Sequence, residues 1–221
     1  MLRATKIEKS YGNLPVLKGI DLEIHKGEIV AIVGASGAGK STLLHILGTL
    51  DHPDKGKVFI HDKDVFGQSS KGLAAFRNKC LGFVFQFHNL LPEFSALENV
   101  MIPGLIGNKD ERTVKKRGQE LLTMLGLADR INHKPSELSG GEQQRTAVAR
   151  AMINAPDLIL ADEPSGNLDS KNAEDLHGLF LQLRRDTGQT FIVVTHNEHL
   201  SELADRRIEL KDGIINKEEK V

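Results

Sequence analysis

The chain has 221 residues, enough for one α/β unit with an inserted subdomain and a sizeable core. Its 29 Lys and Arg residues and 30 Asp and Glu residues give a formal net charge of −1, so we do not expect the basic surface of a nucleic-acid-binding protein. The single cysteine, Cys80, excludes an internal disulfide and a CxxC zinc site, and it fits a reducing cytoplasm. The N-terminus lacks the apolar core of a signal peptide, and no apolar run reaches the roughly 20 residues that cross a bilayer. We therefore expect any role at a membrane to depend on a membrane-embedded partner.

Two strands are expected at the start of the chain. Residues 2–9 alternate apolar and polar side chains, as a half-buried strand does, and residues 16–24 suit a second strand. Tyr11 lies between them, beside Gly12, on an expected loop, and it is the only tyrosine. Its flat ring can stack on a nucleobase, but a tyrosine in this place can equally close a turn. The spacing alone leaves both interpretations open.

The most informative motif is the sequence GASGAGKS at residues 34–41. It follows an apolar strand expected at residues 29–33 and precedes a helix expected at residues 42–47, which is the context of a phosphate-binding P-loop. Glycines let successive backbone N–H groups converge on one anion, and the helix N-terminus adds its positive dipole end. Lys40 can then reach the β- and γ-phosphates, while the Ser41 hydroxyl can bind Mg²⁺. The alternative is a chance glycine-rich turn, against which the flanking strand and helix argue.

A second polar position follows a strand expected at residues 81–85. Before that strand we expect a turn at residues 51–56, a strand at residues 57–60 and a helix at residues 73–79. Gln86 comes directly after the strand, at the kind of strand end where an α/β fold places its ligand crevice. It can bind Mg²⁺ or orient a water molecule, or it can simply be a solvated residue.

The middle of the chain loses the strand pattern. We therefore expect one domain in which a helical subdomain, residues 87–155, is inserted into an α/β core made of residues 1–86 and 156–221. Ser95 and Glu98 have the spacing of a capping box at a helix start.

The loop at residues 87–94 is unusually apolar. It carries four large side chains, which are Phe87, Leu90, Leu91 and Phe94. These side chains either line a groove for a helix of a membrane partner or close the core of the helical subdomain, and both interpretations stay open.

The sequence LSGGEQ at residues 138–143 precedes another expected helix. Ser139 and Glu142 fit a capping box, so one account is a well-formed helix start. A serine and two glycines at a helix N-terminus can also form a second anion site. A single chain seldom needs two phosphate sites unless the second one serves the ligand of a partner.

Two carboxylates end the apolar strand expected at residues 158–162. Asp162 beside a P-loop can hold Mg²⁺, directly or through water, and Glu163 can deprotonate an attacking water. The alternative is an acidic turn at a strand end, which the P-loop makes less plausible.

His196 follows another buried strand, expected at residues 189–195. It can hydrogen-bond a γ-phosphate or the attacking water, although a lone histidine in such a place is usually without function. Residues 195–198 have the spacing of a capping box. A hairpin at Asp212-Gly213 and a frayed tail at residues 217–221 are expected to end the chain.

Taken in order, these motifs resemble the nucleotide-binding subunits of ABC transporters, and the resemblance extends over essentially the whole chain. Residues 138–143 are the discriminating motif, because a P-loop alone also occurs in kinases and GTPases; here the motif ends in Glu-Gln rather than in the commoner single Gln. The resemblance implies an α/β P-loop NTPase fold of ABC type. Its parts are a mixed RecA-like core, an N-terminal antiparallel β subdomain and an inserted helical subdomain.

The resemblance also implies a role for each candidate residue. Tyr11 matches the ring that stacks on the base. The Walker A residues expected to bind the nucleotide are Gly34, Ala35, Ser36, Gly37, Ala38, Gly39, Lys40, Ser41 and Thr42. Three residues are expected to hold Mg²⁺, which are Ser41, Gln86 and Asp162. The residues expected to act in catalysis are Glu163, His196 and Gln86. The signature residues expected to bind the ATP of a second copy are Ser139, Gly140, Gly141 and Glu142.

The implied mechanism is hydrolysis of ATP, with Mg²⁺, by two copies packed head to tail. Each ATP then lies between Walker A of one copy and the signature of the other. Hydrolysis lets the halves separate, and membrane-spanning permease subunits receive this motion near Gln86 and the loop after it. The expected location is the cytoplasmic face of the inner membrane.

Residues 86–99, 135–138 and 161–170 are similar to the ATPases of lipoprotein-releasing complexes of the LolCDE type. This implies a subunit that drives lipoprotein release for transport to the outer membrane, with LolC- and LolE-like partners. FtsE-like cell-division ATPases and MacB-like exporters stay open as alternatives. An ABC protein acting on DNA or ribosomes would normally be longer and basic, and a monomeric P-loop kinase would lack residues 138–143, so we expect neither.

Overall fold

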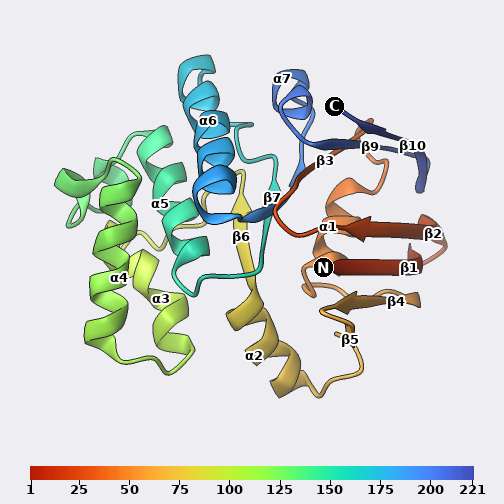
Figure 1. Cartoon of the computed structure of the whole chain (residues 1–221), viewed down its shortest axis with the longest axis horizontal. Coiled ribbons are helices and arrows are strands. Elements are labelled where there is room, and N and C mark those ends of the chain that lie inside the picture. The colour runs from red at the N-terminus through yellow and green to blue at the C-terminus, as the bar shows by residue number, and fades with distance from the viewer. The chain divides into compact units, whose positions relative to one another are not determined.

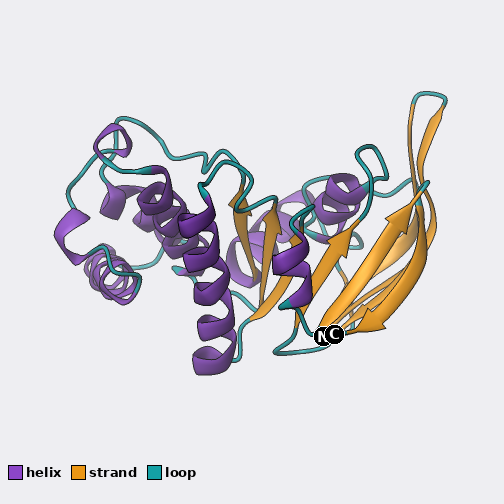
Figure 2. Ribbon diagram, turned by 90° about the horizontal axis from the view of Figure 1, so that it is seen from above, coloured by secondary structure: helices purple, strands orange, loops and turns teal.

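The computed structural model describes all residues from Met1 to Val221 (Figure 1). The chain forms two compact units, one of Met1–Ala74 with Leu181–Val221 and one of Ala75–Phe180. The first unit is rich in strands and the second in helices (Figure 2). None of the helices combines the length and the apolarity needed to span a bilayer.

The first unit contains a four-stranded antiparallel sheet in the order β2-β1-β4-β5. Its strands are β1 (Leu2–Tyr11), β2 (Leu14–Ile24), β4 (Lys55–Ile60) and β5 (Lys63–Asp64). This is the expected N-terminal antiparallel subdomain. One detail differs, because Tyr11 pairs with Leu14 and so ends a strand instead of lying in a loop.

The same unit holds four neighbouring strands in the order β10-β9-β3-β8. They are β3 (Ile29–Val33), β8 (Thr190–Val194), β9 (Arg206–Lys211) and β10 (Ile214–Lys220). β3 runs parallel to β8 and β9, while β10 runs antiparallel to β9, so the sheet is mixed as expected. Every residue of β3 and β8 is buried, which explains their uninterrupted apolar sequences. The helices α1 (Lys40–Leu47) and α7 (Glu198–Glu202) follow β3 and β8 in the chain.

The prediction of a frayed tail at residues 217–221 is wrong. β10 continues to Lys220 and pairs with β9 along its length. The buried guanidinium of Arg206 donates to the carboxylates of Glu218 at 2.5 Å and Glu28 at 2.6 Å. A short polar segment at a chain end carries no local sign of such distant partners.

The second unit contains the parallel strands β6 (Leu81–Phe85) and β7 (Leu158–Asp162). The other helices are α2 (Ser70–Cys80), α3 (Ala96–Ile106), α4 (Glu111–Met124), α5 (Gly140–Met152) and α6 (Ser170–Thr187). α5 packs against β6 and α3, and α3 packs against α4. Residues 87–155 therefore contain helices and no strand, while β6 and β7 belong to the same compact unit as these helices.

Candidate nucleotide-binding site

The strand, turn and helix of the P-loop lie in the first unit. β3 ends at Val33, and α1 begins at Lys40. Gly34 has a φ of 145°, and a Cβ on it would lie 2.1 Å from the carbonyl oxygen of Leu210, so only glycine fits. Gly39, with a φ of 101°, forms the N-cap of α1. The loop therefore depends on two backbone conformations that residues other than glycine rarely adopt.

The N-terminus of α1 differs from those of four other helices. Four other helices, α3, α4, α5 and α7, each have a capping side-chain oxygen and an acidic residue in the first turn. α1 has neither. The ammonium group of Lys40 donates to the carbonyl oxygens of Gly34 at 2.9 Å and Ala35 at 3.0 Å, so a positive charge lies across the loop. An exposed helix end with this charge and no acid is suited to bind phosphate.

Tyr11 lies at the end of β1 and its side chain is 51% exposed. Its hydroxyl donates to the Oδ2 atom of Asp51 at 2.7 Å. This contact raises the pKa of the Tyr11 hydroxyl, and burial adds to the effect. The ring is therefore both accessible and held at its far end.

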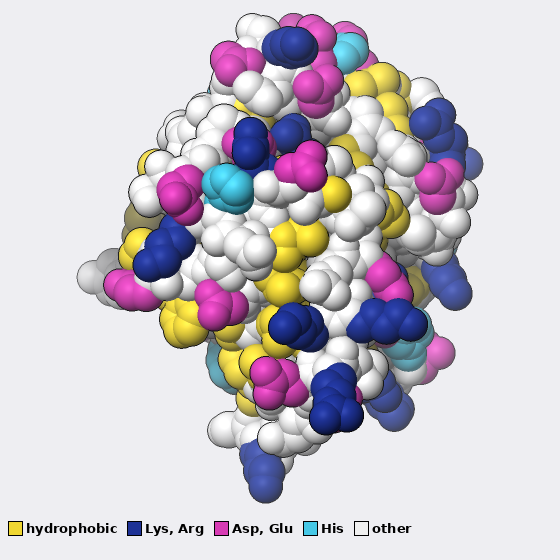
Figure 3. All heavy atoms as spheres, turned by 90° about the vertical axis from the view of Figure 1, so that its left-hand side faces the viewer, with side chains coloured by type: hydrophobic (Ala, Val, Ile, Leu, Met, Phe, Trp, Pro, Cys, Tyr) yellow, Lys and Arg dark blue, Asp and Glu magenta, His cyan; other side chains and the backbone are white.

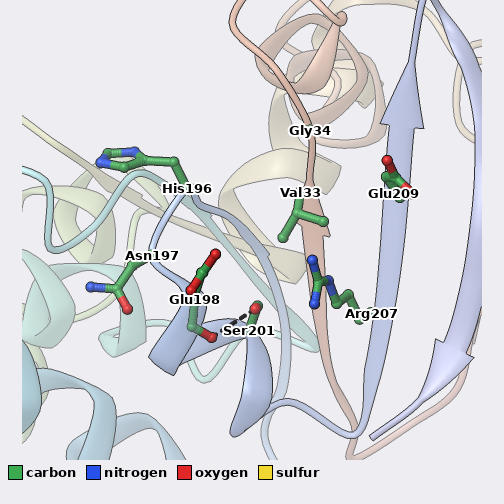
Figure 4. A pocket seen from close by; sticks show the side chains of 8 residues that line it. All are labelled: Val33, Gly34, His196, Asn197, Glu198, Ser201, Arg207 and Glu209. Atoms are coloured by element: carbon green, nitrogen blue, oxygen red, sulfur yellow. Dashed lines mark hydrogen bonds between the residues drawn. The ribbon is translucent and has the colours of Figure 1, made fainter.

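His196 borders a cavity of about 190 Å³ in the first unit (Figure 4). The residues that line the cavity are Val33, Gly34, His196, Asn197, Glu198, Ser201, Arg207 and Glu209. Figure 4 shows the end of β3 on one side and the residues of α7 on the other. The first glycine of the P-loop and His196, distant in the sequence, thus line one cavity.

The helix start after His196 differs from the expected one. Asn197, and not Thr195, caps α7 by accepting a hydrogen bond from the backbone N–H of Leu200. The Thr195 hydroxyl instead accepts from the backbone N–H of Asn197 at 3.0 Å. The predicted capping box at residues 195–198 is therefore wrong, because the chain turns two residues later than its spacing suggests.

Gln86, Asp162 and Glu163 lie close together in the second unit, where two parallel strands end. Phe85 and Asp162 are register partners, so the residues that follow them are neighbours. The Gln86 amide donates to the Oδ1 atom of Asn167 at 3.0 Å, and Asn167 donates back to the Gln86 carbonyl at 3.2 Å. Glu163 has a φ of 47°, a conformation that non-glycine residues rarely adopt and that occurs often at functional sites.

The signature residues begin α5, also in the second unit. The predicted capping box is present: the Ser139 hydroxyl accepts from the Glu142 N–H, and the Glu142 carboxylate accepts from the Ser139 N–H. This backbone donor and the Arg130 guanidinium lower the pKa of Glu142. A Cβ on Gly141 would lie 2.2 Å from the Asn172 amide oxygen, so a larger residue here would displace the Asn172 side chain. Ser139 and Gly140 are exposed.

Comparison with known proteins identifies the family. The ABC transporter family profile matches residues 17–166. The LolD protein of Bacteroides thetaiotaomicron, described as a lipoprotein-releasing system ATP-binding protein, is 60% identical over 99% of this chain and 100% of its own. The chain belongs to the ABC transporter ATP-binding family. The LolD protein of Cytophaga hutchinsonii is 57% identical over 97% of this ABC protein and 98% of its own chain.

Solved ABC structures support the same assignment. The ATP-binding cassette MJ0796, in a dimeric post-hydrolysis state bound to ADP and Pi, has a TM-score of 0.91 and 41% identity. The match covers 100% of this ABC protein and 98% of the cassette. The expected P-loop NTPase fold of ABC type is therefore confirmed, and the ABC protein is an ATPase that binds ATP.

The ATPase also has a buried polar residue that the sequence analysis missed. Gln144, on α5, is fully buried. Its amide donates to the carbonyl oxygen of Pro164 at 2.6 Å and to that of Phe85 at 3.5 Å. Pro164 follows Glu163, and Phe85 precedes Gln86. The Gln144 side chain therefore connects the signature helix α5 to the ends of β6 and β7. A glutamine on the apolar face of a helix was the only available signal.

The apolar loop of the ATPase exposes three of its four large side chains. Phe87 is 74% exposed, Leu91 45% and Phe94 41%. Figure 3, which views the helical side, shows hydrophobic side chains among charged ones. The interpretation that the loop closes the subdomain core therefore does not hold for these three.

Two side chains, those of Arg150 and Asn99, hold the backbone of this loop. The Arg150 guanidinium donates to the carbonyl oxygens of His88 at 2.6 Å and Asn89 at 2.5 Å. Burial, and then the charge of Arg150, lower the pKa of His88. The fully buried amide of Asn99 bonds the backbone of Leu91. The exposed side chains are therefore carried by an ordered backbone.

Proposed function

We propose that this ATPase drives the release of lipoproteins from the bacterial inner membrane, as the ATP-hydrolysing subunit of a LolCDE-like complex at the cytoplasmic face. The observation that carries the proposal is identity of 56–60% to four LolD proteins over at least 97% of the chain. A role in cell division or in MacB-like export is not favoured by these relatives.

The nucleotide is proposed to bind with its phosphates at the P-loop and its base on Tyr11. The uncapped N-terminus of α1 and the Lys40 ammonium supply the positive potential that phosphates require. Mg²⁺ would be held by Ser41, Gln86 and Asp162. Their hydroxyl, amide and carboxylate oxygens are ligands that Mg²⁺ prefers, and this ion usually completes its shell with phosphate and water oxygens.

Bound Mg²⁺ would neutralise charge on the phosphates. Glu163 would act as the general base that takes a proton from the attacking water. His196 would hydrogen-bond the γ-phosphate or that water, and the Gln86 amide would orient the water. Hydrogen bonds with Asn167 hold Gln86 in place. The buried Gln144 amide holds the backbone at Pro164, directly after Glu163.

Two copies are proposed to pack head to tail around two ATP molecules. Ser139 and Gly140 are exposed at the start of α5, where backbone N–H groups can meet the phosphate of a partner's ATP. The charge of each triphosphate would then be shared by two helix N-termini. Loss of the γ-phosphate would remove one side of this link, and the halves would open.

The membrane subunits are proposed to receive this motion at the apolar loop. Phe87, Leu91 and Phe94 offer an exposed hydrophobic surface on a backbone that Arg150 and Asn99 hold. A helix of a permease subunit could bury these side chains, and their position directly after Gln86 links the loop to the nucleotide.

The shared-site mechanism is tested with the Glu163→Gln variant. Glutamine keeps the shape but accepts no proton, so turnover should fall by roughly 10²- to 10⁴-fold while ATP binding persists. Size-exclusion chromatography with light scattering should show a stable dimer in saturating ATP and Mg²⁺. The control is Glu174→Gln, on the exposed surface of α6, which should hydrolyse ATP normally. A Glu163→Gln variant that stays monomeric would contradict the mechanism.

The cellular role is tested by purifying tagged protein from its native cells in detergent and identifying its partners by mass spectrometry. Membrane subunits recovered together with lipoproteins would support lipoprotein release. Recovery of a division-type membrane partner without lipoproteins would keep the ATPase mechanism and overturn the transport role.

A further inference from the structure

The Tyr11 side chain belongs to a network that the nucleotide-binding motifs do not include. Tyr11 ends β1, and its hydroxyl donates to the Oδ2 atom of Asp51, 40 residues later in the chain. Asp51 lies in the turn after α1, the helix that begins at the P-loop. The ring is therefore tied to the turn that follows this helix.

Lys9 holds Asp51 in place from the other side. Its ammonium group donates to the Oδ1 atom of Asp51 at 2.9 Å and to the carbonyl oxygen of His52 at 2.7 Å. Each carboxylate oxygen of Asp51 thus has a different partner. Lys9 is only 9% exposed, so this pair is less screened by water than a surface ion pair. Its ammonium group also lies over the Tyr11 ring, 5.2 Å from the ring centroid.

The charges of this cluster reinforce one another. Burial alone would raise the pKa of Asp51, but the hydrogen bonds from Tyr11, Lys9 and the His52 N–H, together with the charge of Lys9, outweigh it and lower this pKa. The bond to Asp51 raises the pKa of Lys9 and, in the same way, that of Tyr11. Asp51 therefore stays an acceptor, and Tyr11 stays a donor, throughout the physiological pH range.

An exposed tyrosine would otherwise rotate about its two side-chain torsions, and a base that stacks on it would have to stop this rotation. Ordering one flexible side chain on binding costs about 0.5–1.5 kcal/mol in typical interfaces, which corresponds to roughly 2- to 12-fold in affinity. A ring fixed at its far end has already lost this freedom before the ligand arrives.

We propose that Asp51, held by Lys9, is a positioning residue for base recognition: it fixes the Tyr11 ring in advance and so favours nucleotides that carry a base over bare triphosphate. This inference rests on the proposed stacking role of Tyr11. Asp51 itself touches neither the base nor the phosphates in this scheme.

The test compares the affinities of ATP and inorganic triphosphate by calorimetry for four single variants and one double variant of the full chain. Asp51→Ala should weaken ATP binding roughly 2- to 12-fold, and triphosphate should bind this variant as tightly as it binds the wild type. Tyr11→Phe, which leaves the ion pair between Lys9 and Asp51 intact, should give the same loss. The double variant Tyr11→Phe with Asp51→Ala should lose no more ATP affinity than either single change, because both single changes remove the same hydrogen bond between the Tyr11 hydroxyl and Asp51.

The remaining variants separate the possible failures. Tyr11→Ala removes the ring and should weaken ATP by more than Asp51→Ala does. Asp21→Ala is the matched control, because Asp21 accepts a backbone hydrogen bond from Lys6 in the same sheet, and this variant should bind both ligands normally.

If Tyr11→Ala weakens ATP binding while Asp51→Ala and Tyr11→Phe do not, the positioning role is wrong and stacking stands. If Tyr11→Ala binds ATP normally, stacking itself fails. Equal losses of ATP and triphosphate in Asp51→Ala would show that Asp51 acts on the P-loop helix, which also overturns the inference.

Discussion

The second half of the exposed apolar loop, from Leu91 to Phe94, is held by one buried side chain, that of Asn99 on α3. Its Oδ1 atom accepts from the Leu91 N–H at 2.8 Å. Its amide group donates to the carbonyl oxygens of Leu91 at 3.1 Å, Phe94 at 3.1 Å and Ser95 at 3.0 Å. The leucine side chain has a similar size and makes no hydrogen bonds, so Asn99→Leu removes these hydrogen bonds while it keeps the side-chain volume.

The magnitude follows from these bonds. The amide has only two N–H groups for its three carbonyl partners, so with the bond that Oδ1 accepts the side chain makes three full hydrogen bonds. At about 1 kcal/mol net each they set an upper value of about 3 kcal/mol. Leu91 and Phe94 lie at the surface, so water can replace part of what their backbone groups lose. We therefore expect Asn99→Leu to lower the free energy of unfolding by about 2–3 kcal/mol. The same change should speed hydrogen exchange at the Leu91 amide by roughly 30- to 150-fold.

Urea unfolding measures the first quantity, and hydrogen exchange followed by NMR measures the second. Asn132→Leu, at an exposed turn of the same unit, is the control and should change the free energy of unfolding by less than about 0.5 kcal/mol. Unchanged exchange at Leu91 in a destabilised Asn99→Leu variant would show that Asn99 supports α3 and not the loop. Wild-type values for both measurements would refute the reasoning altogether.

Three further substitutions test separate parts of the site. Gly34→Ala should abolish ATP binding in calorimetry, because its Cβ would collide with the Leu210 carbonyl 2.1 Å away; wild-type affinity would disprove the loop geometry. Ser139→Arg should bind ATP normally yet lose phosphate release in a coupled assay, because the arginine blocks the partner's site; normal turnover would exclude a shared site. Leu91→Glu should leave the isolated subunit folded by circular dichroism but prevent co-purification of membrane subunits, whereas unfolding would favour a core role.

Local sequence signals were sufficient where neighbouring residues define the structure. The P-loop was predictable because its glycine spacing, flanking strand and following helix are all contiguous. The capping boxes at Ser95 and Ser139 were predictable for the same reason, since each joins residues three apart. The order of the motifs was enough to indicate the ABC family, because the signature distinguishes it from other P-loop proteins.

Tertiary structure decided the contacts between distant residues. The hydrogen bond between Tyr11 and Asp51 spans 40 residues, and the one between Gln144 and Pro164 spans 20. The pairing of β10 with β9 up to Lys220 overrode the polar sequence that suggested a frayed tail. Composition and periodicity report which face of an element is buried, but they do not report which distant polar group will meet a given side chain. That choice depends on how the sheets and helices pack, because a buried donor requires an acceptor wherever the fold brings one.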